Sequence, residues 1–194
     1  MKAFESTTSE APVAVYAKAF PRGVTIERHQ FTALDRHVGT NRCVLPWAFL
    51  FKETLQPAAL KEALSAALDA FPTLAARVQP EKPVLRFARI TNWQLACCNA
   101  GVPFNVHSSS SSLAELLQTG VMTQRQGFAF PDAKESTLPP YMERMDAAAV
   151  LSGDAPVLAV RLTQLAGGGS ILAVTASHVV LGEPHVLTCA AVKR

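Results

Sequence analysis

The chain is short of charged residues, which make up 17% of its 194 residues against about 25% in an average globular domain. A chain so poor in charge either buries a large interior or leaves apolar surface for a partner. Its net charge is +3, and its Lys and Arg residues are scattered, whereas a nucleic-acid-binding surface needs a basic stripe or patch. We therefore expect no nucleic-acid partner.

Long hydrophobic runs and regular cysteine spacings are also missing. No run approaches the roughly 18 apolar residues of a membrane-spanning helix, and the first twenty residues lack the apolar core of a signal peptide. The cysteines show no CxxC spacing, so neither a disulfide framework nor a zinc knuckle is predicted. We expect a cytoplasmic protein with free thiols, no membrane segment and no metal site. The four cysteines are Cys43, Cys97, Cys98 and Cys189.

The clearest periodicity predicts a helix over residues 57–71. Leu60, Leu64, Leu68 and Phe71 recur at helical spacing and give one apolar stripe, and Pro57 suits the first helical turn. A second helix is predicted over 113–122, because Ser112 and the Glu three positions later form a capping box.

Most of the remaining chain reads as β-strand. Residues 155–165 and 170–180 predict a hairpin, since the glycines at 167–169 allow the positive φ angles of a tight connection. Strands separated by two amphipathic helices predict an α/β domain, with a mixed β-sheet flanked by helices. We expect residues 1–12 to be a flexible leader and 127–140 to be turns. Further strands are expected at 14–20, 23–35, 41–52, 83–90 and 101–107.

One histidine, His178, stands near the end of the last predicted strand. Strand alternation places it on the face of Leu172 and Val174, and places Ser177 on the other face, so these neighbours cannot form a nucleophile–base pair. From composition and spacing alone, a core histidine bonded to a backbone carbonyl is favoured over a catalytic one. The chain has no GxSxG motif, and His185 and Cys189 are not spaced as metal ligands.

Several segments resemble the BAHD acyltransferases, an acyl-CoA-dependent family. "SHVVLG" (177–182) resembles the HxxxDG region, and "FTALD" (31–35) resembles an early leucine–aspartate motif. Residues 47–78 resemble the family's strand, helix and "fPxlAGR" run, and residues 155–182 resemble the hairpin that leads into the catalytic histidine.

The resemblance implies one chloramphenicol acetyltransferase-like domain over residues 13–182, which is half of a two-domain fold. The family's DFGWG segment belongs to the second domain and does not occur here, and residues 183–194 form a divergent tail. We therefore expect a truncated chain, with a missing C-terminal domain as partner and little activity alone.

The resemblance also gives His178 the role of general base. Imidazole can accept a proton near neutral pH, and proton removal from an alcohol or amine speeds its attack on a thioester. The implied substrates are acyl-CoA as co-substrate and a small-molecule acceptor, with no bound cofactor. By position, Trp47 and Phe49 would contact the acceptor, although core packing explains them equally well. Asp35 is expected to hold a turn.

The chain departs from the family at the motif's aspartate. That position is Gly182 here, and Glu183 follows one residue late, so the ion pair that fixes the family's loop is not expected. Arg77, at the end of "LAAR", is expected to make a surface or inter-strand ion pair.

Two other interpretations stay open. The chain could be a non-catalytic interaction domain that binds a partner chain through an exposed apolar face. It could also belong to a related acyltransferase group, such as the condensation domains, although these carry a second histidine where this chain has Ser177.

Overall fold

A central hairpin organises the computed structural model, which describes residues 8–31, 43–80, 93–118, 122–125, 128–131 and 141–180. β10 (Leu158–Leu165) and β11 (Ser170–Ser177) pair antiparallel from Leu158↔Ala176 to Gln164↔Ser170. The connection contains Gly167, Gly168 and Gly169, with φ angles of 75°, 95° and 94°, a region that side chains disfavour. The predicted hairpin is confirmed, including the reason for its glycines.

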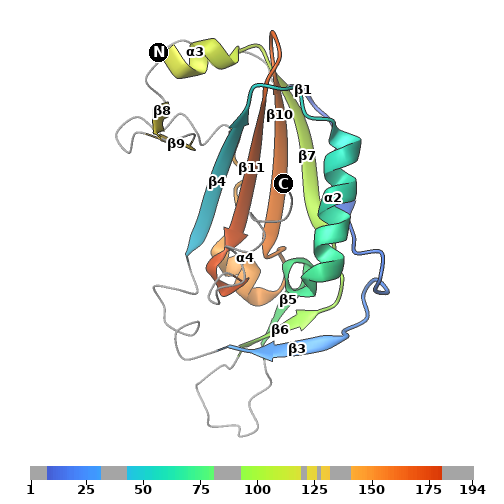
Figure 1. Ribbon diagram of the computed structural model, residues 1–194. Coiled ribbons are helices and arrows are strands. Elements are labelled where there is room, and N and C mark those ends of the chain that lie inside the picture. The colour runs from blue at the N-terminus through green and yellow to red at the C-terminus, as the bar shows by residue number, and fades with distance from the viewer. Residues whose placement is uncertain are drawn as a thin grey trace, which may run out of the picture.

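Two strands flank the hairpin and make the sheet mixed. β4 (Val44–Phe51) is antiparallel to β11, whereas β7 (Val102–Ser109) is parallel to β10. β1 (Thr8–Ser9) and β2 (Val13–Val15) extend the sheet beyond β7. Among the described residues the sheet therefore has six strands, and β4 forms the edge opposite β1 and β2 (Figure 1).

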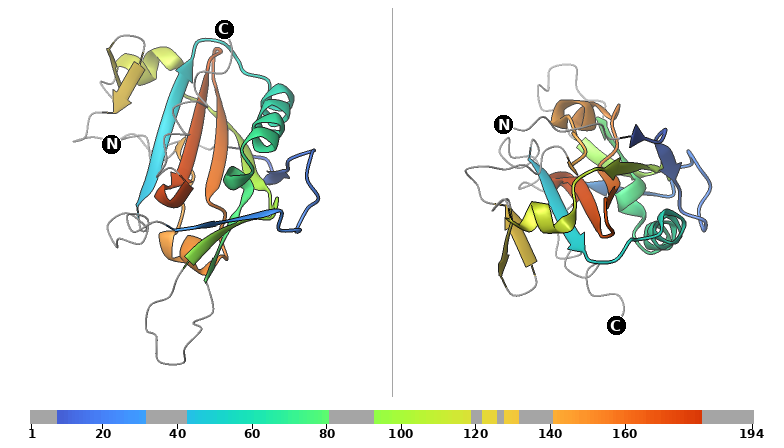
Figure 2. Two further views of the ribbon diagram at one scale, coloured as in Figure 1. Left: turned by 60° about the horizontal axis from the view of Figure 1, so that its bottom comes forward. Right: turned by 90° about the horizontal axis from the view of Figure 1, so that it is seen from above.

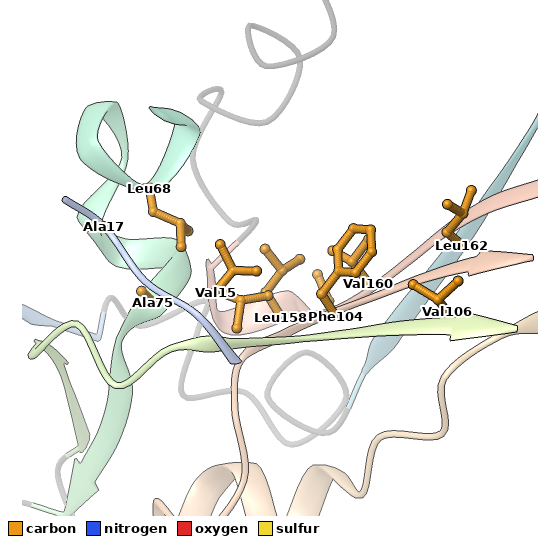
Figure 3. Packing of buried hydrophobic residues seen from close by; sticks show 11 residues of the cluster. Val15, Ala17, Leu68, Ala75, Phe104, Val106, Leu158, Val160 and Leu162 are labelled. Atoms are coloured by element: carbon orange, nitrogen blue, oxygen red, sulfur yellow. The ribbon is translucent and has the colours of Figure 1, made fainter. Parts of the chain in front are cut away.

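Helix α2 (Pro57–Ala70) covers one face of this sheet, which we call the α2 face. Its stripe of Leu60, Leu64 and Leu68 packs on alternate residues of the strands, as the 3.6-residue and two-residue periods require. α2 runs along the β7 side, away from β4 (Figures 1 and 2). The buried cluster beneath it, part of which Figure 3 shows, includes Val15, Phe104, Val106, Leu158, Val160 and Leu162.

A short helix packs against the opposite face of the sheet. Leu113 and Leu116 of α3 (Leu113–Gln118) join a cluster with Leu165 and Ile171. The predicted capping box opens α3: Ser112 Oγ accepts from the Glu115 N–H at 3.2 Å, and Glu115 Oε2 accepts from the Ser112 N–H at 2.8 Å.

A second, smaller sheet lies at one end of the main sheet (Figure 2). β3 (Glu27–Gln30) and β5 (Arg77–Pro80) both pair antiparallel with β6 (Trp93–Cys97), so β3 is an edge strand. α4 (Ala147–Ser152) packs against β5. The 3₁₀ turn η1 (Pro72–Ala75) connects α2 to β5 along the chain. A separate pair is formed by β8 (Met122–Arg125) and β9 (Phe128–Pro131).

The main elements are as predicted, but several details differ. Residues 8–9 of the expected flexible leader 1–12 form strand β1. Strand 14–20 is reduced to Val13–Val15, the helix predicted to reach residue 122 gives way to β8 at Met122, and the expected turns of 127–140 include β9. β5, β6 and α4 were not predicted. The predicted strand 83–90 and the segment 32–35 lie outside the described residues, as do residues 1–7 of the predicted leader and the tail after residue 180.

Candidate functional site

His178 lies at the point where β11 ends, and the expectation that it belongs to the strand is wrong. The strand stops at Ser177, and His178 begins η3 (His178–Val180), a single 3₁₀ turn. The backbone nevertheless stays bonded to the residues that immediately precede the two neighbouring strands. The Ser177 N–H donates to Val157 O and the His178 N–H donates to Cys43 O, each at 2.9 Å. The histidine is therefore held by its backbone at the end of the sheet.

The imidazole of His178 is half-buried, and its Nδ1 faces the interior. Nδ1 is buried and has no hydrogen-bond partner in the described part of the chain. Within the described residues, the ring therefore lacks the Nδ1–carbonyl bond that would mark an ordinary core histidine. Nδ1 therefore belongs to a buried edge of the half-buried ring.

Ser177 cannot serve as a nucleophile for this histidine. Its side chain is completely buried, and Oγ has no hydrogen-bond partner among the residues that the structure describes. It belongs to the opposite face of the sheet, as strand alternation predicts. A substrate could not reach this hydroxyl, so a covalent acyl-serine intermediate is not supported.

An apolar strip runs along the α2 face toward His178. It covers the part of β4 and β11 that lies away from α2, where Trp47 pairs with Val174 and Phe49 with Leu172. Trp47 is half-buried against the core below α2, and Phe49 is 40% exposed. We call these residues the apolar strip: Leu45, Trp47, Phe49, Leu172 and Val174.

η3 closes this end of the strip and joins the two cores of the domain. Val180 packs against the cluster beneath α2 and also against the cluster of the smaller sheet, which contains Val179, Val150 and Val157. Two packed clusters thus hold Val179 and Val180, the two residues that follow His178. This arrangement limits the freedom of the turn that carries the imidazole.

The opposite face of the sheet carries buried polar groups. Arg161 Nε and Glu143 Oε1 lie 2.6 Å apart in an ion pair that is largely shielded from solvent. Thr175 Oγ1 donates to the backbone carbonyl of Glu143 at 3.1 Å, so the segment around residue 143 is bonded to two central strands. Ion pairs of this kind fix an arrangement more than they stabilise it.

The charges of this ion pair affect the pKa of His107, on β7. We therefore expect His107 to make the stability of the fold depend on pH. Burial lowers the pKa of His107, Arg161 lowers it further, and Glu143 opposes them. The unfolded chain, with an ordinary histidine pKa of about 6.5, then binds more protons than the folded chain below that pH. Stability should therefore fall as the pH drops through this range.

We expect the His107→Gln variant to lose part of this decrease. Urea unfolding of both proteins at about pH 7.5 and about pH 5.5 measures the effect as a difference between the two pH values. An unchanged difference in the variant would place the responsible group elsewhere.

The remaining residues singled out from the sequence lie away from His178 or outside the described part of the chain. Arg77 donates to the carbonyls of Ala76 and Ala100, at 3.0 and 3.4 Å, so the expected ion pair is wrong for the described residues. Burial lowers the pKa of Arg77. Asp35 lies outside the described residues, and so do Gly182, Glu183, His185 and Cys189.

The described cysteines are free thiols, and one of them belongs to a group of potential metal ligands. Cys43, Cys97 and Cys98 are free thiols, as predicted. Within the described ranges, one set of three metal-ligating side chains converges: Glu27 and His29 on β3 with Cys97 on β6. Sequence reasoning missed this set because its members are far apart in the chain and only strand pairing brings them together.

In the part of the chain that the structure describes, no helix has the length and apolarity needed to cross a membrane.

Comparison with known proteins identifies a family and a fold. The model of a family described as the transferase family matches residues 46–183. No curated protein matches the chain by sequence. Among solved structures, vinorine synthase superposes with a TM-score of 0.58 at 19% identity over 90% of this chain. TRI101 of F. graminearum, complexed with ethyl coenzyme A, gives 0.55 at 16% identity over 84%.

The matches cover only part of those enzymes. The chain spans 38% of the length of vinorine synthase and 38% of that of TRI101. The likeness confirms the predicted fold, an α/β domain equivalent to one half of these structures. At such low identity it shows the fold alone.

Proposed function

The chain belongs to the transferase family of BAHD acyltransferases, and from this premise we propose that it supplies the catalytic half of an enzyme that moves an acyl group from acyl-CoA to a hydroxyl or amine. The observation that carries the proposal is His178, which the matched segment includes and which stands at the end of the apolar strip. TRI101 of F. graminearum has been crystallised with coenzyme A and T-2 mycotoxin, which supports coenzyme A as the carrier of the acyl group.

In the proposed reaction His178 is the general base. Nε2 accepts the proton of the acceptor hydroxyl or amine while its oxygen or nitrogen attacks the thioester carbonyl. The C–S bond then breaks, and the departing thiolate takes the proton from the imidazolium to leave as free coenzyme A. No covalent acyl-enzyme is required, which agrees with the burial of Ser177.

The buried position of Nδ1 supports a fixed role for Nε2. A histidine whose Nδ1 faces the interior and whose backbone is bonded to Cys43 cannot turn freely, so the direction of Nε2 is set before the substrate arrives. Such preorganisation lowers the entropy cost of reaching the transition state. The base would then face whatever covers the apolar strip.

Trp47 and Phe49 are proposed to contact the acceptor. Both side chains belong to the α2 face of β4, and the His178 backbone is bonded to Cys43, the residue that precedes β4. Apolar side chains with a few polar groups are the usual lining of small-molecule sites. The identity of the acceptor would depend on the second half of the fold as well.

The experiment that tests the proposal is acyl transfer with a second half present, followed as coenzyme A release. The substitution His178→Gln should remove the activity, and turnover that does not depend on His178 would contradict the proposed base.

A second candidate function is that of an interaction domain, and the apolar strip is the observation that favours it. Trp47 and Phe49 expose apolar surface on a chain that already has little charge. In this case the chain would bind a partner through the strip without catalysing a reaction.

We expect the strip to cause self-association of the isolated chain. Replacing Phe49 with serine should shift the protein toward monomer in gel filtration, because the side chain contributes exposed apolar area to the contact. Leu117→Ser is the matched control, since Leu117 has a similar exposure of 39% but lies on α3. Equal effects of the two substitutions would show that the strip is not the contact.

A further inference from the structure

The edge of the smaller sheet gathers three metal-ligand types at one point. Glu27 and His29 are two positions apart on β3, so their side chains share a face of the strand. Cys97 is the register partner of Glu27 on β6, and the antiparallel pairing therefore places its side chain on the same face. The potential ligand atoms of the three residues all lie within 4.8 Å of one another.

The separations are close to those of a tetrahedral zinc site. Zn–N, Zn–O and Zn–S bonds of about 2.0–2.3 Å at tetrahedral angles place neighbouring ligand atoms roughly 3.3–3.6 Å apart. His29 Nε2 and Glu27 Oε2 are already 3.4 Å apart. The Cys97 sulfur lies within 4.8 Å of these atoms, and rotation of the two exposed side chains would complete the set of three ligands. We propose that Glu27, His29 and Cys97 bind a Zn²⁺ ion at the edge of the β3–β6 sheet.

The chemistry of the donors selects the metal. Thiolate and imidazole are both good ligands for Zn²⁺, which also accepts carboxylate oxygen, whereas Mg²⁺ and Ca²⁺ prefer sites made of oxygen alone. Three protein ligands leave the fourth position to a water molecule. Glu27 and His29 are exposed side chains, so an ion can enter from solvent without disturbing the core.

The buried side of the site is rigid. Cys97 is 1% exposed and packs in the core cluster with Leu95, Val78 and Phe31. The exposed ligands belong to β3, whose four residues are all exposed and which forms one edge of its sheet. A bound ion would thus tie an edge strand to the core, in addition to the backbone ladder between β3 and β6.

Cobalt binding tests the site directly, because a Co²⁺–thiolate bond gives an absorption band that carboxylate and imidazole alone do not give. We expect the purified 194-residue chain to bind one equivalent of Co²⁺ with this band, and Zn²⁺ to displace it. Zn²⁺ should also raise the midpoint of thermal unfolding, since the metal binds the folded state. A chain that binds no Co²⁺, or binds it without the thiolate band, would overturn the proposal.

Three variants locate the ligands. His29→Ala should weaken Zn²⁺ binding by about tenfold or more, because even the loss of a group that only orients a ligand costs about 10–100-fold. This residue is exposed, so the variant should fold. Cys97→Ser should lose the cobalt band, whereas Cys98→Ser should keep it, because Cys98, the matched control, follows the end of β6 and is not part of the converging set. Unchanged affinity in His29→Ala, or loss of the band in Cys98→Ser, would contradict the assignment. None of these results depends on acyl transfer.

Discussion

Replacing His178 with glutamine should lower the rate of acyl transfer by about 10²- to 10⁴-fold in an enzyme that contains both halves of the fold. Glutamine preserves much of the size and polarity of the side chain but cannot accept the proton of the acceptor. The backbone contacts of His178 with Cys43 are independent of the side chain, so the end of β11 should keep its structure. The measurement is the initial rate of coenzyme A release over a range of acceptor concentrations.

The matched control is the same substitution at His107, a half-buried histidine of the same sheet that belongs to the opposite face. We expect His107→Gln to retain the rate within about twofold, which corresponds to roughly 0.4 kcal/mol in activation free energy. Full activity in His178→Gln would contradict the proposed role of His178 as general base. Equal losses in both variants would point to a structural effect of losing a histidine.

Replacing Phe104 with alanine should reduce the free energy of unfolding by about 3–5 kcal/mol. The Phe104 side chain is 1% exposed and lies in the cluster beneath α2, among Val15, Leu158 and Val160 (Figure 3). Its removal leaves a cavity between the helix and the sheet that the β-strands cannot close without breaking their pairing. Equilibrium unfolding in urea measures the change.

Phe49→Ala provides the comparison, because the same atoms are removed from a side chain that is 40% exposed. We expect a loss of less than about 1 kcal/mol there, since little apolar surface is returned to water. Similar losses in the two variants would show that the cluster beneath α2 contributes no more to stability than the exposed apolar strip.

The sequence predicts the fold where a pattern is local and regular. The leucine stripe of α2 and the three glycines of the β10–β11 turn each determine their element with little help from the rest of the chain. β5, β6 and β3 give weaker signals because they are short and their pairing joins distant segments. α4 is one and a half turns long, too short for a helical periodicity to be recognised, and its Asp146 cap is the main local signal.

The site is predicted only in part. Alternation along β11 correctly separates Ser177 from the α2 face but cannot show that the strand stops there and that η3 begins at His178. The reason is that the end of the strand is set by the packing of Val179 and Val180 between two cores, which is a property of the tertiary structure. The convergence of Glu27, His29 and Cys97 likewise depends on pairing between strands.

Coenzyme A release from a panel of acyl-CoAs and acceptors tests the central claim most directly when it is measured in two mixtures. One contains the 194-residue chain alone, and the other contains the chain together with a second half of the fold on a separate polypeptide, with gel filtration showing that the two have assembled. The account predicts no turnover above background in the first mixture and acceptor-dependent turnover in the second. Turnover by the chain alone, or an assembled pair that releases no coenzyme A, would contradict it.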